Sequence, residues 1–279
     1  MVQFPFSWDM ENGFLRAWWF DPLTATLGFG AFIHWYWYEE RKRGLSSNND
    51  IRDTLGMWGF GPLYNSLASY WVGIFLWKCV VPPAASIIPD GIPDSASSLL
   101  YLLLEVGTGI VLYDAVFFFL HWSMHELPFL RGWHERHHEE QSVEARDVLR
   151  HSVMDGSLQV LVNILVQRTN PWGSTKTRLA RFLHNLLVTW MLTESHTSSP
   201  HPYIWRRYFV GVREHRLHHS HQTNQHARRR YQQFFGYLDN TLTFLTSTSS
   251  RSWRCFGFNK SGLTTTRARV KILRRTKQT

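Results

Sequence analysis

Histidine is the residue type whose number and spacing indicate chemistry in this chain. Of 15 histidines, 14 lie between His121 and His226, where even spreading would place about six. Eight fall in three short motifs, HWSMH at 121–125, HERHH at 134–138 and HRLHH at 215–219. Residues three and four apart share one face of a helix, so each motif predicts imidazoles that converge on a common point.

Converging imidazoles predict a metal centre. The three motifs supply more donors than one octahedral ion can take, which favours a site for two metal ions. Imidazole ligation suits iron, copper, zinc or nickel rather than magnesium or calcium. Asp114, seven residues before His121, is either an outer acceptor that orients an imidazole or a buried carboxylate paired elsewhere, and both interpretations stay open.

The order of the motifs, the eight residues between the first two and their position after a long apolar segment resemble the fatty acid hydroxylase / sterol desaturase superfamily. The resemblance covers about Leu99–Phe244 and adds the isolated histidine of Thr193-Glu-Ser-His196 to the motif histidines. The metal ligands that it implies are His121, His125, His134, His137, His138, His196, His215, His218 and His219. It also implies two iron ions, dioxygen as co-substrate and oxygen-dependent attack on a lipid C–H bond.

The same resemblance implies an all-α fold, in which an integral membrane helical domain carries a cytosolic, histidine-rich cap for two metal ions. It implies a multi-pass protein of the endoplasmic reticulum that receives electrons from a b-type cytochrome and its NAD(P)H-dependent reductase. Relatives often carry a Trp-Asp pair and an FGT-like ending after the third motif, whereas this chain has FGYLDNT, so only Asp239 matches. Further ligand candidates are His151, His184, His201, His221 and His226, whereas His34 is expected to be a packed or membrane-interface residue.

Two other function classes were weighed against this one. His134-Glu135-Arg136-His137-His138 also reads as H-E-x-x-H, the signature of zinc metalloproteases with Glu135 as general base. That interpretation leaves the first and third motifs unused, and the third motif has Arg216 where a glutamate would be needed. The third class is a histidine-rich membrane protein that binds metals without catalysis.

The elements that must position these residues begin with two apolar segments. Thr54–Val81 and Leu100–Trp122 each supply the roughly 20 residues that a helical membrane crossing needs. The loop between them is rich in proline and lacks Lys and Arg, whereas basic residues precede the first segment and follow the second. The positive-inside rule therefore predicts a hairpin whose loop, Pro82–Ser97, faces the lumen, with the histidine motifs in the cytosol.

Other apolar segments are less decisive. Leu23–Tyr38 is either a third crossing or an interfacial helix, and Ser157–Val166 and Phe182–Thr193 are crossings, a re-entrant pair or surface helices. No cleavable signal is expected, because acidic residues stand where a basic region should be. The expected divisions are an N-terminal segment over 1–52, a transmembrane hairpin over 53–122, a histidine-motif domain over 123–246 and a basic, flexible tail over 247–279.

Composition excludes several classes. With 44% hydrophobic and 15% aromatic residues, the chain is too apolar for a disordered protein. Two cysteines, Cys79 and Cys255, cannot build a disulfide framework or a multi-cysteine zinc module. Arg251–Thr279 holds nine basic residues and no acidic one, which equals the whole net charge of +9. We expect this tail to contact an anionic membrane surface rather than nucleic acid.

The sequence thus predicts a di-iron lipid oxygenase. Hydroxylation is favoured over desaturation, and the substrate is a sterol, a fatty acyl chain or a sphingoid base. Asn259-Lys-Ser261 is a glycosylation sequon in the tail, and a cytosolic tail predicts that it stays unmodified.

Overall fold

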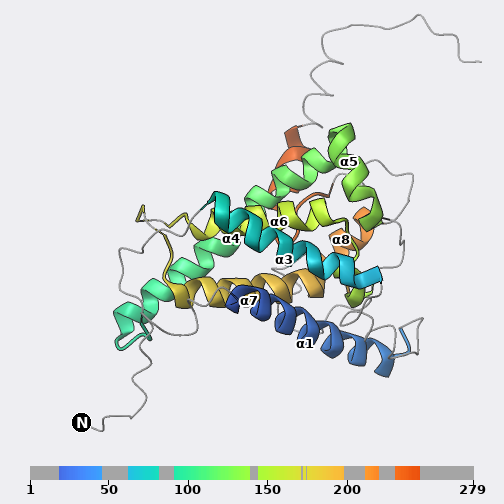
Figure 1. The fold of residues 1–279 in the computed structure, drawn as a ribbon. Coiled ribbons are helices and arrows are strands. Elements are labelled where there is room, and N and C mark those ends of the chain that lie inside the picture. Colours follow the sequence, from blue (N-terminus) through green and yellow to red (C-terminus); the bar gives the residue numbers. More distant parts are fainter. Residues whose placement is uncertain are drawn as a thin grey trace, which may run out of the picture. The chain divides into compact units, whose positions relative to one another are not determined.

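The computed structural model describes residues 19–45, 62–81, 91–138, 144–170, 172–173, 175–197, 211–219 and 230–245. Within these ranges the chain is helical and contains no strand, which confirms the all-α part of the expected fold class (Figure 1). The chain divides into two compact units, Met1–Asn240 and Thr241–Thr279. In the second unit the described residues, 241–245, are helical, and the expected tail at 247–279 lies outside the described residues.

The longest helix is α4, Ala96–Glu126, which ends in the first histidine motif. Ser95 caps its N-terminus by accepting from the backbone N–H of Ser98, and the Ser98 side chain closes a reciprocal capping box. The helix ends at Leu127, which is extended because it precedes Pro128. Its 31 residues span about 46 Å. Among the described helices, α4 has the length and composition for a membrane crossing.

The other expected crossing is only partly described. Helix α3 runs over Pro62–Val80, and residues 54–61 of the expected segment lie outside the described part of the chain. Its apolar portion, Tyr70–Val80, is shorter than a crossing. Leu23–Tyr38 lies within α1, Phe20–Lys42.

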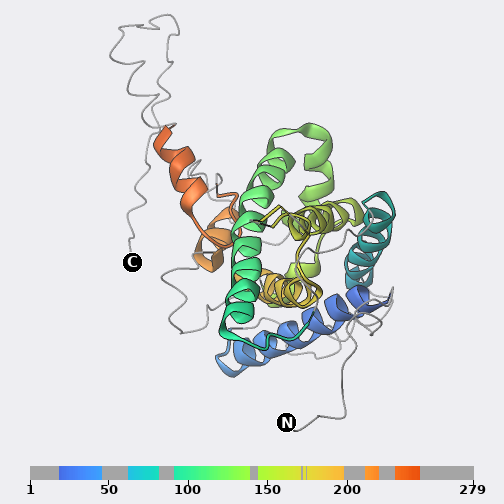
Figure 2. The same ribbon diagram turned by 90° about the vertical axis from the view of Figure 1, so that its left-hand side faces the viewer.

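Helices α6, Val153–Gln167, and α7, Arg178–Ser195, form the centre of the bundle. Helix α6 packs against α3 and α4, and α7 packs against α1 and α4. Figure 2 shows α6 and α7 nearly end-on, with α4 on one side and α3 on the other. The two helices of the expected hairpin are therefore separated by α6, and most residues of α6 and α7 are buried or half-buried within the bundle.

Small residues allow this close packing. A Cβ on Gly73 of α3 would lie 3.0 Å from the Cα of Ser157 in α6. Beside this contact, the Trp77 indole N–H donates to the carbonyl oxygen of Ser157 at 2.8 Å. On the other side of the bundle, a Cβ on Gly109 of α4 would lie 2.7 Å from the His184 ring of α7.

A buried carboxylate in α4 holds the connection between α6 and α7. Glu105 accepts from the Asn170 amide at 2.6 Å and from the Thr177 hydroxyl at 2.6 Å. It also accepts from the Thr177 backbone N–H at 3.2 Å. Because Glu105 lies near the start of α4 and the histidines lie near its end, the α6–α7 connection is at the end of the bundle opposite the histidine motifs.

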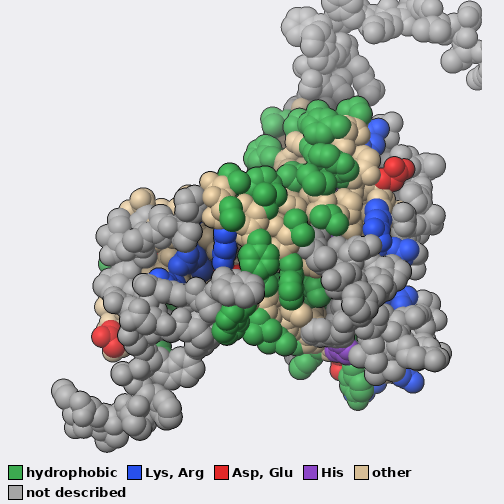
Figure 3. Space-filling view, viewed as in Figure 1, with side chains coloured by type: hydrophobic (Ala, Val, Ile, Leu, Met, Phe, Trp, Pro, Cys, Tyr) green, Lys and Arg blue, Asp and Glu red, His purple; other side chains and the backbone are tan. Residues whose placement is uncertain are grey.

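Short helices follow α4, and the first two of them carry the second motif. They are α5 at Pro128–His134 and the 3-10 helices η2 at Glu135–His138 and η3 at Ala145–Leu149. Helix α8, Gly211–His219, carries the third motif. Apolar side chains gather over α5 and over one face of α3 (Figure 3), and exposed examples include Phe129 and Phe75.

Candidate metal centre

Nine histidines from four parts of the fold meet at one end of the bundle. The end of α4 contributes His121 and His125, and α7 contributes His196 at its C-terminal cap. The remaining six come from the α5–η2 segment and from α8. These are the nine residues that the sequence predicts as ligands.

The nine side chains form two groups. In each group the potential ligand atoms lie within 4.8 Å of one another. The five-histidine cluster consists of His121, His125, His134, His138 and His218, and the four-histidine cluster consists of His137, His196, His215 and His219. The clusters adjoin, because the His138 and His219 rings stack with centroids 4.4 Å apart.

The second and third motifs are each divided between the clusters, which corrects the expectation that each motif converges on one point. The second motif passes from α5 into η2, and His137 joins the four-histidine cluster while His134 and His138 join the five-histidine cluster. In α8, His215 and His219 share a face, while His218 projects into the five-histidine cluster. The second and third motifs therefore link the two clusters, whereas both histidines of the first motif lie in the five-histidine cluster.

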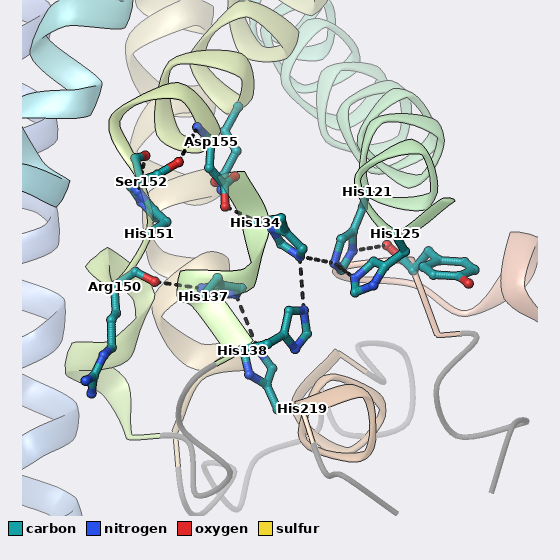
Figure 4. Close-up of polar contacts among 12 residues, drawn as sticks. His121, His125, His134, His137, His138, Arg150, His151, Ser152, Asp155 and His219 are labelled. Atoms are coloured by element: carbon teal, nitrogen blue, oxygen red, sulfur yellow. Dashed lines mark hydrogen bonds and ion pairs between the residues drawn. The ribbon is translucent and has the colours of Figure 1, made fainter. Parts of the chain in front are cut away.

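In the five-histidine cluster, hydrogen bonds to acceptors outside the cluster fix the orientation of two rings (Figure 4). His134 Nδ1 donates to Asp155 Oδ2 at 2.8 Å, and His121 Nδ1 donates to the carbonyl oxygen of Tyr231 at 2.8 Å. A carboxylate oxygen and a carbonyl oxygen can only accept a hydrogen bond, so Nδ1 of each ring must be the donor. Each neutral ring therefore carries its proton on Nδ1 and a free lone pair on Nε2. These two Nε2 atoms face each other at 3.1 Å. Two lone pairs at this distance repel unless a cation lies between them.

The four-histidine cluster repeats this arrangement with backbone acceptors. His196 Nδ1 donates to the carbonyl oxygen of Leu192 at 2.7 Å, and His137 Nδ1 donates to that of Arg150 at 3.2 Å. Their Nε2 atoms lie 3.3 Å apart. His215 Nε2 joins them at 3.0 Å from His196 Nε2.

Burial keeps these imidazoles neutral. Removal from water, and then repulsion from neighbouring histidines, lowers the pKa of His137, His215 and His219 well below the ordinary value. Burial lowers the pKa of His196 to about 4. Neutral imidazole is the form that binds metal.

The donor set fits transition-metal ions. Two imidazole nitrogens at right angles on one ion, each about 2.1 Å away, are about 3 Å apart, close to the separations in both clusters. His218 adds a second indication, because neither ring nitrogen hydrogen-bonds to any described residue although the side chain is 5% exposed. A buried group without a partner is costly, and a metal ion would supply the missing partner.

Sequence reasoning missed Asp155 and left Asp114 undecided. Asp155 lies in the first turn of α6. The position of a carboxylate at the start of an apolar segment could have identified it from the sequence. Asp114 contacts no clustered imidazole and instead accepts from the backbone N–H groups of Gln233, Phe234 and Phe235. Asp114 is therefore a buried carboxylate with partners elsewhere in the chain, and not an acceptor that orients an imidazole.

Asp239, the one residue that matches the family pattern after the third motif, acts on the same segment. It accepts from the backbone N–H groups of Tyr231 at 2.9 Å and Gln232 at 3.1 Å. The carbonyl oxygen of Tyr231 is the acceptor for His121. Asp114 and Asp239 thus act on the five-histidine cluster through the backbone of residues 231–235.

The remaining candidate histidines lie elsewhere. His184 hydrogen-bonds to Asn163 Oδ1 at 2.9 Å, His34 hydrogen-bonds to the carbonyl oxygen of Gly30 at 2.7 Å, and His151 lies behind His137 and outside both clusters. His201, His221 and His226 lie outside the described residues. Glu135 is exposed on η2, and the protease interpretation would use only His134 and His138 of the nine clustered histidines.

Comparisons with known proteins agree with the family resemblance of the histidine motifs. Residues 106–243 match the family model described as fatty acid hydroxylase. Cholesterol 25-hydroxylase of Mus musculus is 27% identical over 141 residues, which cover 47% of this chain and 45% of that protein. Cholesterol 25-hydroxylase of Homo sapiens is 28% identical over 143 residues, covering 48% and 50%. The chain spans about half the length of these curated relatives, and no solved structure matches it.

Proposed function

The chain belongs, through residues 106–243, to the fatty acid hydroxylase family, and from this premise we propose that it is a membrane-bound hydroxylase that acts on a lipid C–H bond. The observation that carries the proposal is the pair of adjoining histidine clusters, each with fixed Nε2 lone pairs that face one another. This arrangement suits two metal ions, one in each cluster.

Iron is the metal that the family implies, and bound iron supplies the ability, once reduced, to activate dioxygen. The protein's own residues hold neutral imidazoles at fixed orientations and bury them among helix ends. Asp155 and the carbonyl oxygens of Tyr231, Arg150 and Leu192 fix the ring tautomers.

The proposed reaction is hydroxylation. One atom of dioxygen enters the lipid as a hydroxyl group, and two electrons and two protons convert the other atom to water. The relatives named cholesterol 25-hydroxylase support hydroxylation over desaturation and support a sterol among the candidate substrates. A fatty acyl chain and a sphingoid base remain in the proposed substrate class.

We place the enzyme in the endoplasmic reticulum membrane, with the clusters in the cytosol. Helix α4 supports membrane insertion by its length and apolar composition, and Arg131 and Arg136 after it support a cytosolic histidine end. The proposed electron donors are a b-type cytochrome and its reductase.

Turnover under isotopically labelled dioxygen tests this function. Membranes containing the full chain, reductant and its electron donors should yield a lipid product that retains one labelled oxygen atom. A variant lacking His137 should yield none. An unlabelled alkene would replace hydroxylation by desaturation, and peptide hydrolysis by a zinc-loaded protein would overturn the oxygenase assignment.

A further inference from the structure

A narrow cavity of about 70 Å³ lies inside the bundle among α1, α3, α6 and α7. The residues that line it are spaced along each helix, from Asp21 to Phe29 in α1, from Tyr70 to Lys78 in α3 and from Gln159 to Gln167 in α6. Each stretch advances eight residues, so the cavity extends about 12 Å along the bundle at 1.5 Å per residue. This small volume over that length leaves an elongated and narrow space.

The two ends of the cavity differ in polarity. The end nearer the histidines is walled by Phe29, Val160 and Leu192, together with Tyr70 and Gln159, whose polar groups are already hydrogen-bonded to each other and to Asp155. The far end carries the amides of Asn163, Gln167 and Asn185, together with the half-exposed ion pair of Asp21 and Lys78. An apolar wall does not hold water well, whereas amides bind oxygen atoms. The cavity therefore suits a molecule with a hydrocarbon body and one oxygen-bearing end.

Asn185 provides the donor for that oxygen. Its Oδ1 accepts from Asn163 Nδ2 at 2.8 Å and from Gln167 Nε2, which leaves its own N–H groups to donate. No acceptor for them occurs among the described residues. Asn185 lines the cavity, so an oxygen atom bound there could accept from its N–H groups.

The apolar end lies close to both histidine clusters. Leu192 is one helical turn before His196. Gln159 is one turn after Asp155 and donates to its Oδ1 at 3.0 Å. Along α7, Asn185 precedes His196 by 11 residues, or about 16 Å.

We propose that this cavity is the passage for the lipid substrate, with its oxygen-bearing end on Asn185 and its hydrocarbon end toward the clusters. The class that fits is an elongated lipid alcohol or carbonyl compound, and not a phospholipid with two chains and a charged head group. The reacting carbon then lies roughly 16 Å from the anchored oxygen. This inference rests on the proposed function, because it takes the clusters as the reacting end.

Photo-crosslinking tests the orientation without turnover. The full chain in lipid nanodiscs is irradiated with hexadecanol carrying a diazirine at the chain end, or with a matched probe carrying it beside the hydroxyl group. The chain-end probe should label Tyr70, Gln159 or Leu192, and the hydroxyl-end probe should label Asn163, Gln167 or Asn185. Labelling confined to the exposed face of α4, at Leu103 or Val111, would overturn the proposal.

Neighbouring residues of α6 give a matched pair of variants. Ile164 lines the cavity, whereas Leu165 is 44% exposed. Ile164→Phe should reduce cavity labelling at least about tenfold by filling the space, and Leu165→Phe should leave it unchanged. Metal content, measured on both variants, reports that the bundle has folded. Cavity labelling without lipid oxidation would refute the proposed function alone, and lipid oxidation that persists without cavity labelling would refute this inference alone.

Discussion

His134 shows how one residue is prepared for metal binding. Its Nδ1 donates to a buried carboxylate, Asp155, and its Nε2 faces the lone pair of His121. Asp155 is itself held by Gln159, whose Oε1 accepts from the Tyr70 hydroxyl at 3.3 Å. A chain of hydrogen bonds thus connects the cavity wall to a ligand. Burial by itself raises the pKa of Asp155, but the hydrogen bond from His134 and the neighbouring histidines outweigh burial and lower the pKa below its ordinary value.

Replacing Asp155 with Asn should weaken metal binding by the five-histidine cluster about 10- to 100-fold, because the ring loses a charged acceptor. Metal content per chain after dialysis against graded chelator measures the effect. Asp147→Asn is the control, since Asp147 is buried and accepts from the Glu144 backbone N–H without contacting a clustered histidine. Equal losses in both variants would show that the effect is only structural.

Single histidine substitutions should remove metal from one cluster at a time. His218→Ala acts on the five-histidine cluster and His137→Ala on the four-histidine cluster, so each should reduce the iron content from about two ions per chain toward about one. Both should abolish lipid hydroxylation. His184→Ala, which changes a buried histidine outside both clusters, should leave the iron content unchanged. Stoichiometric zinc and peptidase activity would contradict the di-iron proposal.

At the scale of elements, α4 joins three functions in one helix. Near its start, Glu105 accepts hydrogen bonds from the α6–α7 connection. In its middle, Asp114 accepts hydrogen bonds from residues 232–235. Its end supplies His121 and His125. Both carboxylates are almost fully buried and accept from several donors, which compensates the cost of placing charge inside the bundle. The spacing along one rigid helix therefore fixes the loop and the ligands relative to each other.

Asp114→Asn should destabilise this arrangement by at least about 2 kcal/mol, because an amide can accept from fewer of the four donors that surround the carboxylate. Thermal unfolding of the purified protein measures the loss. Metal content should fall as well, since residues 231–235 carry the acceptor for His121. Glu126→Gln, at an exposed position of the same helix, is the control and should change neither quantity.

At the scale of the whole molecule, every described clustered histidine lies at one end of the bundle and the α6–α7 connection at the other. Helix α6 begins near Asp155, beside the clusters, and runs away from them. Helix α7 runs back toward the clusters and ends at His196. The proposed lipid cavity and the clustered histidines thus share one set of helices.

This polarity predicts the topology of the chain. An engineered glycosylation sequon in the loop Pro82–Ser97 should be glycosylated if it is spaced adequately from the bilayer, whereas the native sequon at Asn259 should remain unmodified. A mobility shift that endoglycosidase reverses provides the measurement. Glycan on Asn259 would contradict a cytosolic tail and, with it, the proposed orientation of the clusters.

Local sequence determined the nine candidate ligands and the helical class, and it led to the expectation of more than one metal ion. Histidine spacing within a motif is a local property, and a count of donors does not depend on the fold. The family resemblance, confirmed by the match over residues 106–243, also depended on these local motifs.

Tertiary structure alone decided how the ligands are shared. In the second and third motifs the histidines four residues apart stay in one cluster and the remaining histidine joins the other, and only the packing of the helices shows that a second cluster lies on that side. The contact of Asp155 with His134, the capture of residues 231–235 by Asp114 and Asp239, and the cavity beside Asn185 all join distant parts of the chain. Periodicity reports which face a residue occupies on its own helix, but it carries no information about the partner that packing brings to that face.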